Sequence, residues 1–168
     1  IAIRGNPYAI GRVIPRGILR VAAWDAGPIM PSDQSGRLQL AQWLADRRNP
    51  LLPRVTVNRI WARLFGRGLV PTVDYFGTRG ERPSHPELLD HLASRLISEG
   101  WSQKAVIRAI VLSRTYRLSS YPSDSAVAVD PDNRLLWRMS PQRLDAESLR
   151  DSLLAVSGQL QDCSGGPG

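Results

Sequence analysis

The stretch Asn49–Asp90, NPLLPRVTVNRIWARLFGRGLVPTVDYFGTRGERPSHPELLD, decides the fold of this 168-residue chain. It predicts a helix that ends near Phe65, a glycine-punctuated crossing segment and the start of a second helix. At 3.6 residues per turn, one face of the first helix is apolar. The residues on this face are Val57, Ile60, Trp61, Leu64 and Phe65. We expect this face to form the core. Further apolar residues face the other way, which favours a central helix covered on more than one side; they are Leu51, Leu52 and Val55.

Two polar residues, Arg54 and Asn58, lie one turn apart along the edge of the apolar face. Buried polar groups need hydrogen-bond partners, so we interpret both as structural. Gly66 is placed to end the helix in the left-handed conformation, which costs glycine little. Pro71 cannot continue a helix, so residues 69–73 are predicted to be an extended crossing segment.

The second helix is predicted from Ser84-His85-Pro86-Glu87, in which Ser84 and Glu87 have the spacing of a capping box. Its apolar stripe comprises Leu88, Leu89, Leu92, Ala93 and Leu96. Residues 72–83, between the helices, are predicted to form a loop anchored by Tyr75 and Phe76. Four charged residues of this loop are expected to form a mainly structural cluster of salt bridges. They are Asp74, Arg79, Glu81 and Arg82.

Before the central stretch, residues 1–34 lack helical periodicity and are rich in glycine and proline. We interpret them as an extended arm or linker that leads in from a preceding domain, with a short strand considered at residues 17–21. The arm's apolar residues should lie on the helical body or on that domain; they are Ile14, Ile18, Leu19 and Val21. Residues 36–47 are predicted to form a helix capped by Ser35 and antiparallel to the central helix.

After the central stretch, Ser102 is predicted to cap a helix over residues 103–113 whose polar residues point outward. These are Gln103, Lys104 and Arg108. Tyr116 is expected to dock on the core, residues 121–129 to form the most mobile loop, and residues 133–139 to form a short helix.

A last helix follows Pro141, with an apolar stripe of Ala146, Leu149, Leu153, Val156 and Leu160. Asp145 with Arg138 or Arg143 is predicted to form a buried ion pair, and Arg143 and Glu147 to pair at helical spacing. The pattern predicts an all-α domain over residues 35–168, an irregular bundle of about six helices with an extended N-terminal arm.

The net charge of +7 comes from 21 arginines and a single lysine, Lys104, against 15 acidic residues. The basic residues are spread along the chain with no run of five, so a nucleic-acid-binding surface is not favoured. No apolar run has transmembrane length and no signal peptide is present. The chain opens at Ile1, and we expect its targeting signal to lie elsewhere in a longer protein. The lone cysteine, Cys163, cannot form an internal disulfide, and without a CxxCH motif no haem is expected to be attached.

Motifs for chemistry are nearly absent: the sequence holds no phosphate-binding loop, nucleophile elbow or cysteine–histidine pair. We predict neither a metal site nor a cofactor, because His85 and His91 project in different directions and Arg95 lies one turn from His91. Five residues are candidates for a catalytic site, and His85 is the first choice among them for a titrating group. They are Asn58, Arg59, Asp74, His85 and Asp90.

A series of ordered motifs resembles one protein family. The motifs are NPL-x2-RV-x-VNRIW-x3-FGRGLV-x-T, D-x-FG, PSHPELLD, W-S-x-K, S-x-TYR-x-SS, DP-x-NRLLWR and RL-x-AE-x-LRD-x-LLAVSG. They resemble the PSD1 domain (DUF1553 family) over about residues 4–166. Two positions depart from the family's pattern: Tyr75 stands where Asp or Asn is expected, and His91 where an aromatic residue is expected.

The resemblance implies a C-terminal region of large exported proteins of planctomycetes and related bacteria, accompanied by a DUF1549 region and often by a c-type cytochrome domain. Periplasmic or cell-envelope localisation is implied in the same way. The family has no established activity. Our leading hypothesis is therefore a non-catalytic docking or scaffold domain that contacts the preceding DUF1549-type region. The alternatives are an active site completed by that region, and helix-turn-helix-like nucleic-acid binding.

Overall fold

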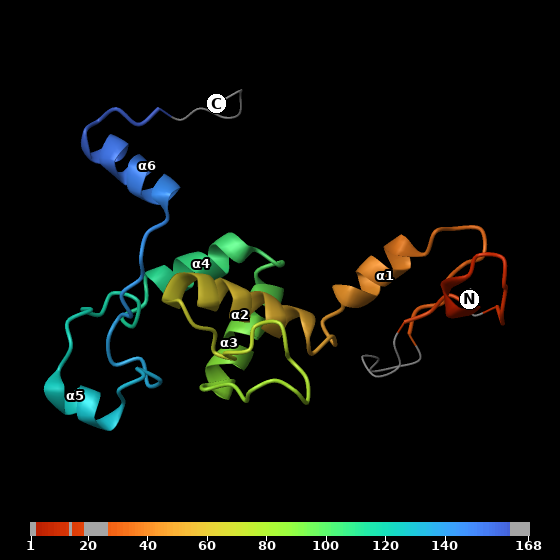
Figure 1. Ribbon diagram of the computed structural model, residues 1–168, viewed down its shortest axis with the longest axis horizontal. Coiled ribbons are helices and arrows are strands. Elements are labelled where there is room, and N and C mark those ends of the chain that lie inside the picture. The colour runs from red at the N-terminus through yellow and green to blue at the C-terminus, as the bar shows by residue number, and fades with distance from the viewer. Residues whose placement is uncertain (1–2, 14, 19–26, 162–168) are drawn as a thin grey trace. The chain divides into compact units, whose positions relative to one another are not determined.

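The structure is a computed structural model that describes residues 3–13, 15–18 and 27–161. In these residues it contains six α-helices and one short 3-10 helix, η1 (Ile3–Gly5), and it has no sheet, which confirms the all-α class (Figure 1). The α-helices are α1 (Arg37–Leu44), α2 (Leu52–Phe65), α3 (Pro86–Ser98), α4 (Gln103–Val111), α5 (Asp124–Val129) and α6 (Ala146–Val156). The chain divides into two compact units, Ile1–Ile110 and Val111–Gly168.

The core of the first unit lies where α2 packs against α3. The buried apolar residues of α2 are Val57, Trp61 and Phe65, and those of α3 are Leu89, Leu92, Ala93 and Leu96. The Trp61 and Phe65 rings stack with their centroids 4.1 Å apart. Leu69 and Val70 from the crossing segment and Val106 and Ile110 from α4 complete the set. Most of the predicted apolar face of each helix is thus core, but Ile60, Leu64 and Leu88 are only half-buried. Leu51, Leu52 and Val55 stay partly or largely exposed.

The end of α2 follows its sequence signal, whereas the start of α3 does not. Gly66 ends α2 with a left-handed φ of 81°. At α3 the predicted capping box is wrong, because His85 occupies the cap position and no side chain caps the helix. The Ser84 hydroxyl instead donates to the Leu69 carbonyl at 3.2 Å, and the Ser84 backbone N–H donates to the same oxygen at 2.8 Å. Ser84 thus donates to a carbonyl of the crossing segment, and the predicted bond from a backbone N–H of α3 to its hydroxyl oxygen is not formed.

The helix before α2 is shorter than predicted. Gly36, with φ 77°, precedes α1, the helix ends at Leu44, and none of its residues is buried. The predicted antiparallel packing of this helix along α2 is not seen, because α2 and α3 form the extensively packed pair of described helices. Arg16 of the arm donates to the carbonyls of Pro31, Ser32 and Gln34. The strand considered at residues 17–21 falls largely outside the described residues, as do Ile14, Leu19 and Val21, and the domain boundary at residue 34 stays a prediction.

The corner between α3 and α4 forms as predicted, with Ser102 accepting from the Ala105 N–H at 3.3 Å. Gly100 and Trp101 both adopt a left-handed φ of 64°. The Trp101 N–H donates to the Leu96 carbonyl at 2.8 Å, and this bond closes the end of α3. The three polar residues Gln103, Lys104 and Arg108 face solvent.

The second unit corrects several predictions. Residues 124–129, predicted as a mobile loop, form α5, and residues 133–139, predicted as a helix, form a compact loop instead. Asp130 organises this loop: its carboxylate accepts from the N–H groups of Arg134 at 2.9 Å and Leu135 at 2.7 Å. Its backbone carbonyl accepts from the Trp137 indole at 2.9 Å.

The same loop holds Asn133 and Leu136 at left-handed φ values of 53° and 57°. The Asn133 side chain donates to the Arg138 carbonyl at 2.9 Å and accepts from the Arg138 N–H at 3.3 Å. Buried side chains of Asp130 and Asn133 thus satisfy backbone groups that a helix would have paired. A helix start and a loop held by side chains have similar sequence patterns, because Asp and Asn are common in both.

The last helix begins at Ala146. Asp145, predicted in a buried ion pair, is exposed, and its carboxylate caps α6 by accepting from the Ser148 N–H at 2.7 Å. Arg143 lies before the helix and is exposed, so the predicted helical spacing with Glu147 does not apply. None of the residues of α6 is buried, and its apolar stripe is largely in solvent.

Candidate functional site

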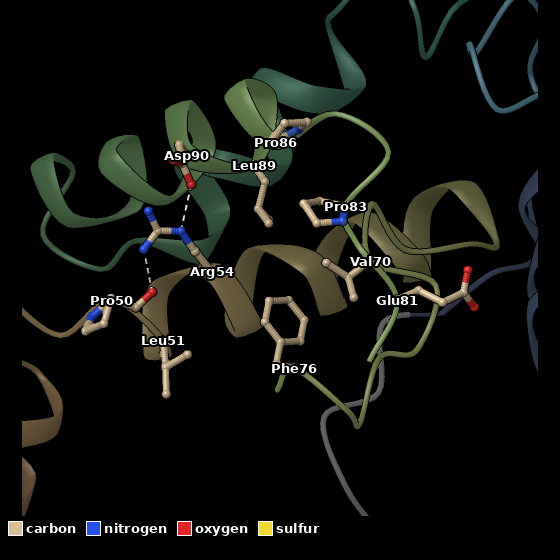
Figure 2. A pocket seen from close by; sticks show the side chains of 10 residues that line it. All are labelled: Pro50, Leu51, Arg54, Val70, Phe76, Glu81, Pro83, Pro86, Leu89 and Asp90. Atoms are coloured by element: carbon tan, nitrogen blue, oxygen red, sulfur yellow. Dashed lines mark hydrogen bonds and ion pairs between the residues drawn. The ribbon is translucent and has the colours of Figure 1, made fainter. Parts of the chain in front are cut away.

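A pocket of about 240 Å³ opens in the first unit between the start of α2, the start of α3 and the loop that joins them (Figure 2). Its lining residues come from all three segments. They are Pro50, Leu51, Arg54, Val70, Phe76, Glu81, Pro83, Pro86, Leu89 and Asp90. Most of these side chains are apolar, and three are prolines.

The crossing segment that forms one wall is fixed by Asn58, whose side chain is fully buried. Its amide Nδ2 donates to the Val70 carbonyl at 3.0 Å, and its Oδ1 accepts from the Val70 N–H at 2.8 Å. One side chain therefore satisfies both backbone polar groups of a buried residue, as a neighbouring strand would. Gly68 makes this approach possible, because a Cβ there would lie 2.5 Å from the Val70 carbonyl oxygen.

The loop wall, residues 71–83, is closed on itself. The Thr72 hydroxyl donates to the Tyr75 carbonyl at 3.1 Å and accepts from the Glu81 N–H at 2.9 Å. The bond from the Ser84 N–H to the Leu69 carbonyl joins the two ends of the loop. Such a loop has close ends and internal packing, the characteristics of an Ω-loop. It places the half-buried Phe76 against the pocket and leaves Tyr75 exposed, so only one of the two predicted anchors is an anchor.

An ion pair closes one end of the pocket. Arg54 Nε donates to Asp90 Oδ1 at 2.6 Å, and Arg54 Nη1 donates to the Pro50 carbonyl at 2.6 Å (Figure 2). The hydrogen bond from Arg54 lowers the pKa of Asp90, with the charge of Arg54 acting in the same direction. Asp90 is thus ionised at neutral pH, which does not suit a general acid.

The candidate catalytic residues do not converge. Of the five predicted, Asp90 lines the pocket, whereas Asn58 is fully buried and bonded to the Val70 backbone. Arg59 and Asp74 form an exposed ion pair at 3.4 Å. His85 Nδ1 lies 3.0 Å from the Ser84 hydroxyl. Each of these groups has a local partner, and together they do not form an acid–base pair around one cavity.

Arg54 and Asn58, which were predicted to be structural, bond Asp90 and Val70, while Glu87 lies exposed in the first turn of α3. The apolar lining of the pocket was not predicted from the sequence, above all the combination of Val70, Pro83 and Leu89. The available signal was the set of prolines at positions 50, 83 and 86, which bracket the central stretch.

A second, more apolar hollow of about 200 Å³ lies between the end of α1 and the start of α2. Its lining residues are Trp43, Leu44, Asn49, Leu51, Leu52 and Val55. Within the described residues, no three histidine, cysteine or acidic side chains are grouped so that they could hold a metal ion. None of the described helices is long and apolar enough to span a membrane.

Comparison with known proteins gives one match. Neither a curated protein nor a solved structure matches the chain. The model of one family, PSD1, a protein of unknown function (DUF1553), matches residues 36–168. This span covers most of the chain and contains α1 to α6, including the pocket between α2 and α3, so the chain belongs to the PSD1 (DUF1553) family.

Proposed function

We propose that this region is a non-catalytic docking domain that binds a preceding DUF1549-type region of the same polypeptide. The observation that carries the proposal is the state of α6. Its sequence places apolar residues on one stripe, yet Leu149, Leu153 and Val156 are 51%, 66% and 91% exposed. Exposed apolar stripes of this kind are typical of surfaces that bind another protein.

A second feature supports docking over catalysis. Helix α1 also buries none of its residues: Leu38, Leu40 and Leu44 are exposed, and Leu44 lines the hollow at the start of α2. By contrast, the polar side chains predicted as catalytic candidates have hydrogen-bond or ion-pair partners close by in the fold. A domain with satisfied polar groups and uncovered apolar helices is suited to association, because association covers apolar surface.

The wider context of the proposal rests on the family resemblance. We propose that the polypeptide is exported and that a c-type cytochrome domain belongs to the same assembly. Fractionation of cells that express the full-length protein tests this localisation. Recovery in the cytoplasmic fraction would contradict it.

The docking proposal is tested by titrating the chain with the separately produced preceding region, using calorimetry. Leu153→Asp is expected to weaken binding at least about tenfold, because a carboxylate replaces an apolar anchor. Ala155→Asp is the matched control: it adds the same charge to α6, about a third of a turn or more from the stripe, and should leave binding within about twofold.

Two results would overturn the proposal. The first is an equal loss of binding in both variants. The second is a lowered thermal stability of the α2–α3 core in Leu153→Asp alone, which would mean that α6 packs on its own chain. Circular dichroism and thermal melting of each variant separate these outcomes from simple unfolding.

A further inference from the structure

The pocket between α2, α3 and the Ω-loop has a chemical character that defines a ligand class. Its walls are the apolar side chains of Val70, Phe76 and Leu89 and the rings of three prolines. Figure 2 shows Phe76 and Leu89 pointing toward a common space. The Phe76 ring can stack on another ring, edge-on or offset, which favours an aromatic occupant.

The pocket offers few free hydrogen-bonding groups on its walls. Proline residues carry no N–H. Both backbone polar groups of Val70 are bonded to Asn58. A polar ligand group that entered between these walls would therefore lose its hydration without gaining a partner there.

The charges around the pocket are balanced. Arg54 and Asp90 neutralise each other at 2.6 Å, and a second guanidinium nitrogen of Arg54 bonds the Pro50 carbonyl. Although Glu81 belongs to the lining, its carboxylate points away from the space between Phe76 and Leu89 in Figure 2. Neither a cation nor an anion thus meets an uncompensated opposite charge.

From these observations we infer that the pocket is a binding site for an uncharged molecule with a single aromatic ring. A volume of about 240 Å³ holds one ring with a short substituent, and is below the range of pockets that hold larger ligands. The Arg54–Asp90 pair sets the specificity, because its neutrality disfavours charged relatives of the same ligand. This inference does not depend on the docking function proposed above.

The test is a titration of the isotope-labelled chain, followed by NMR, with three ring compounds of similar size: benzyl alcohol, benzylamine and phenylacetate. Benzyl alcohol should give saturable shifts at the amides of Phe76, Leu89 and Asp90, with a dissociation constant on the order of millimolar. The two charged probes should bind about tenfold more weakly.

Two variants give opposite and specific outcomes. Asp90→Asn leaves Arg54 unpaired and should strengthen phenylacetate binding about two- to fivefold. Arg54→Gln leaves Asp90 unpaired and should strengthen benzylamine binding by a similar factor. Glu87→Gln, an exposed change on α3 that does not line the pocket, is the matched control and should leave all three affinities unchanged. A loss of folding cannot produce these opposite gains.

A fourth probe, N-acetyl-phenylalaninamide, distinguishes the source of the ring. If it binds as well as benzyl alcohol, the site accepts a ring carried by a peptide, and if it does not, the site accepts the free molecule. The inference is overturned if the charged probes bind the unaltered chain as tightly as benzyl alcohol. It is also overturned if shifts do not saturate at the pocket, or if the two variants leave the preference unchanged.

Discussion

The α2–α3 pair and α6 have similar sequence patterns and opposite outcomes. All three helices carry apolar residues at helical spacing, but α2 and α3 bury theirs, whereas α6 buries none in the described chain. The difference lies in the chain segment that follows each helix. The segment after α2 returns through Gly68 to Val70 and is fixed by Asn58, which brings α3 onto α2. Amphipathic spacing thus predicts that an apolar helix face is stabilised by burial against another surface. It does not predict that this surface belongs to the same unit.

The largest effect on the packing of α2 against α3 is expected from Gly68→Ala. A Cβ at this position would lie 2.5 Å from the Val70 carbonyl oxygen and 2.9 Å from both side-chain amide atoms of Asn58. The crossing segment would have to move, which breaks the Asn58–Val70 bonds inside the core. We expect a loss of about 3–5 kcal/mol in the free energy of unfolding, measured by urea denaturation.

Gly77→Ala is the control for this change, because a Cβ at Gly77 meets nothing within 4 Å. It should alter the free energy of unfolding by less than about 0.5 kcal/mol. If Gly68→Ala changes the free energy of unfolding as little as Gly77→Ala does, then the crossing segment is not held close to Asn58 by the bonds to Val70.

Matched leucine-to-alanine substitutions compare α3 with α6 directly. Leu96 on α3 is fully buried, so Leu96→Ala should cost about 2–4 kcal/mol by leaving a cavity in the core. Leu153 on α6 is 66% exposed, and Leu153→Ala should cost less than about 0.5 kcal/mol. Denaturation followed by circular dichroism measures both. Equal costs would show that α6 is packed as tightly as α3.

The smallest expected effect concerns the loop at Asp130, in the second unit. Hydrogen bonds from the Leu135 and then the Arg134 N–H lower the pKa of this carboxylate, against an opposing effect of burial. Since the folded loop binds the proton less readily than the unfolded chain, its contribution to stability is fully present above about pH 4. It is lost as the pH falls through the lowered pKa.

Hydrogen exchange at the Leu135 amide, followed by NMR, measures this loss. Protection should be constant from neutral pH down to about pH 4, after correction for the intrinsic exchange rate, and should fall at lower pH. In Asp130→Asn the change below pH 4 should disappear. A loss of protection near pH 6 would contradict the assignment, because Asp130 does not titrate there.

Several features of the candidate site were predictable because they depend on local chemistry. The period of Val57, Trp61 and Phe65 defines one side of a helix wherever that helix lies. Asn58 sits on the edge of this face, so its need for a buried partner followed from the sequence. The partner itself, Val70, is twelve positions away, and only the folded chain could identify it.

Other predictions failed where a residue had both a local and a distant option. Ser84 had the spacing to cap α3, but the Leu69 carbonyl lies within its reach in the fold and takes its hydrogen bond. Asp130 and Asn133 could have begun a helix, but their side chains instead hold a loop with two left-handed residues. Local patterns rank such options within about a kcal/mol, and tertiary contacts decide between them.

The sequence by itself determined the all-α class, the apolar faces of α2 and α3, the glycine end of α2 and the serine cap of α4, because each depends on neighbours within about one helical turn. The tertiary structure alone decided which chain segments form the walls of the pocket. It joined Arg54 to Asp90 across 36 positions and brought Phe76 and Leu89 to the walls of one pocket. A pocket is a relation between segments far apart in the chain, and no periodicity within one segment encodes it.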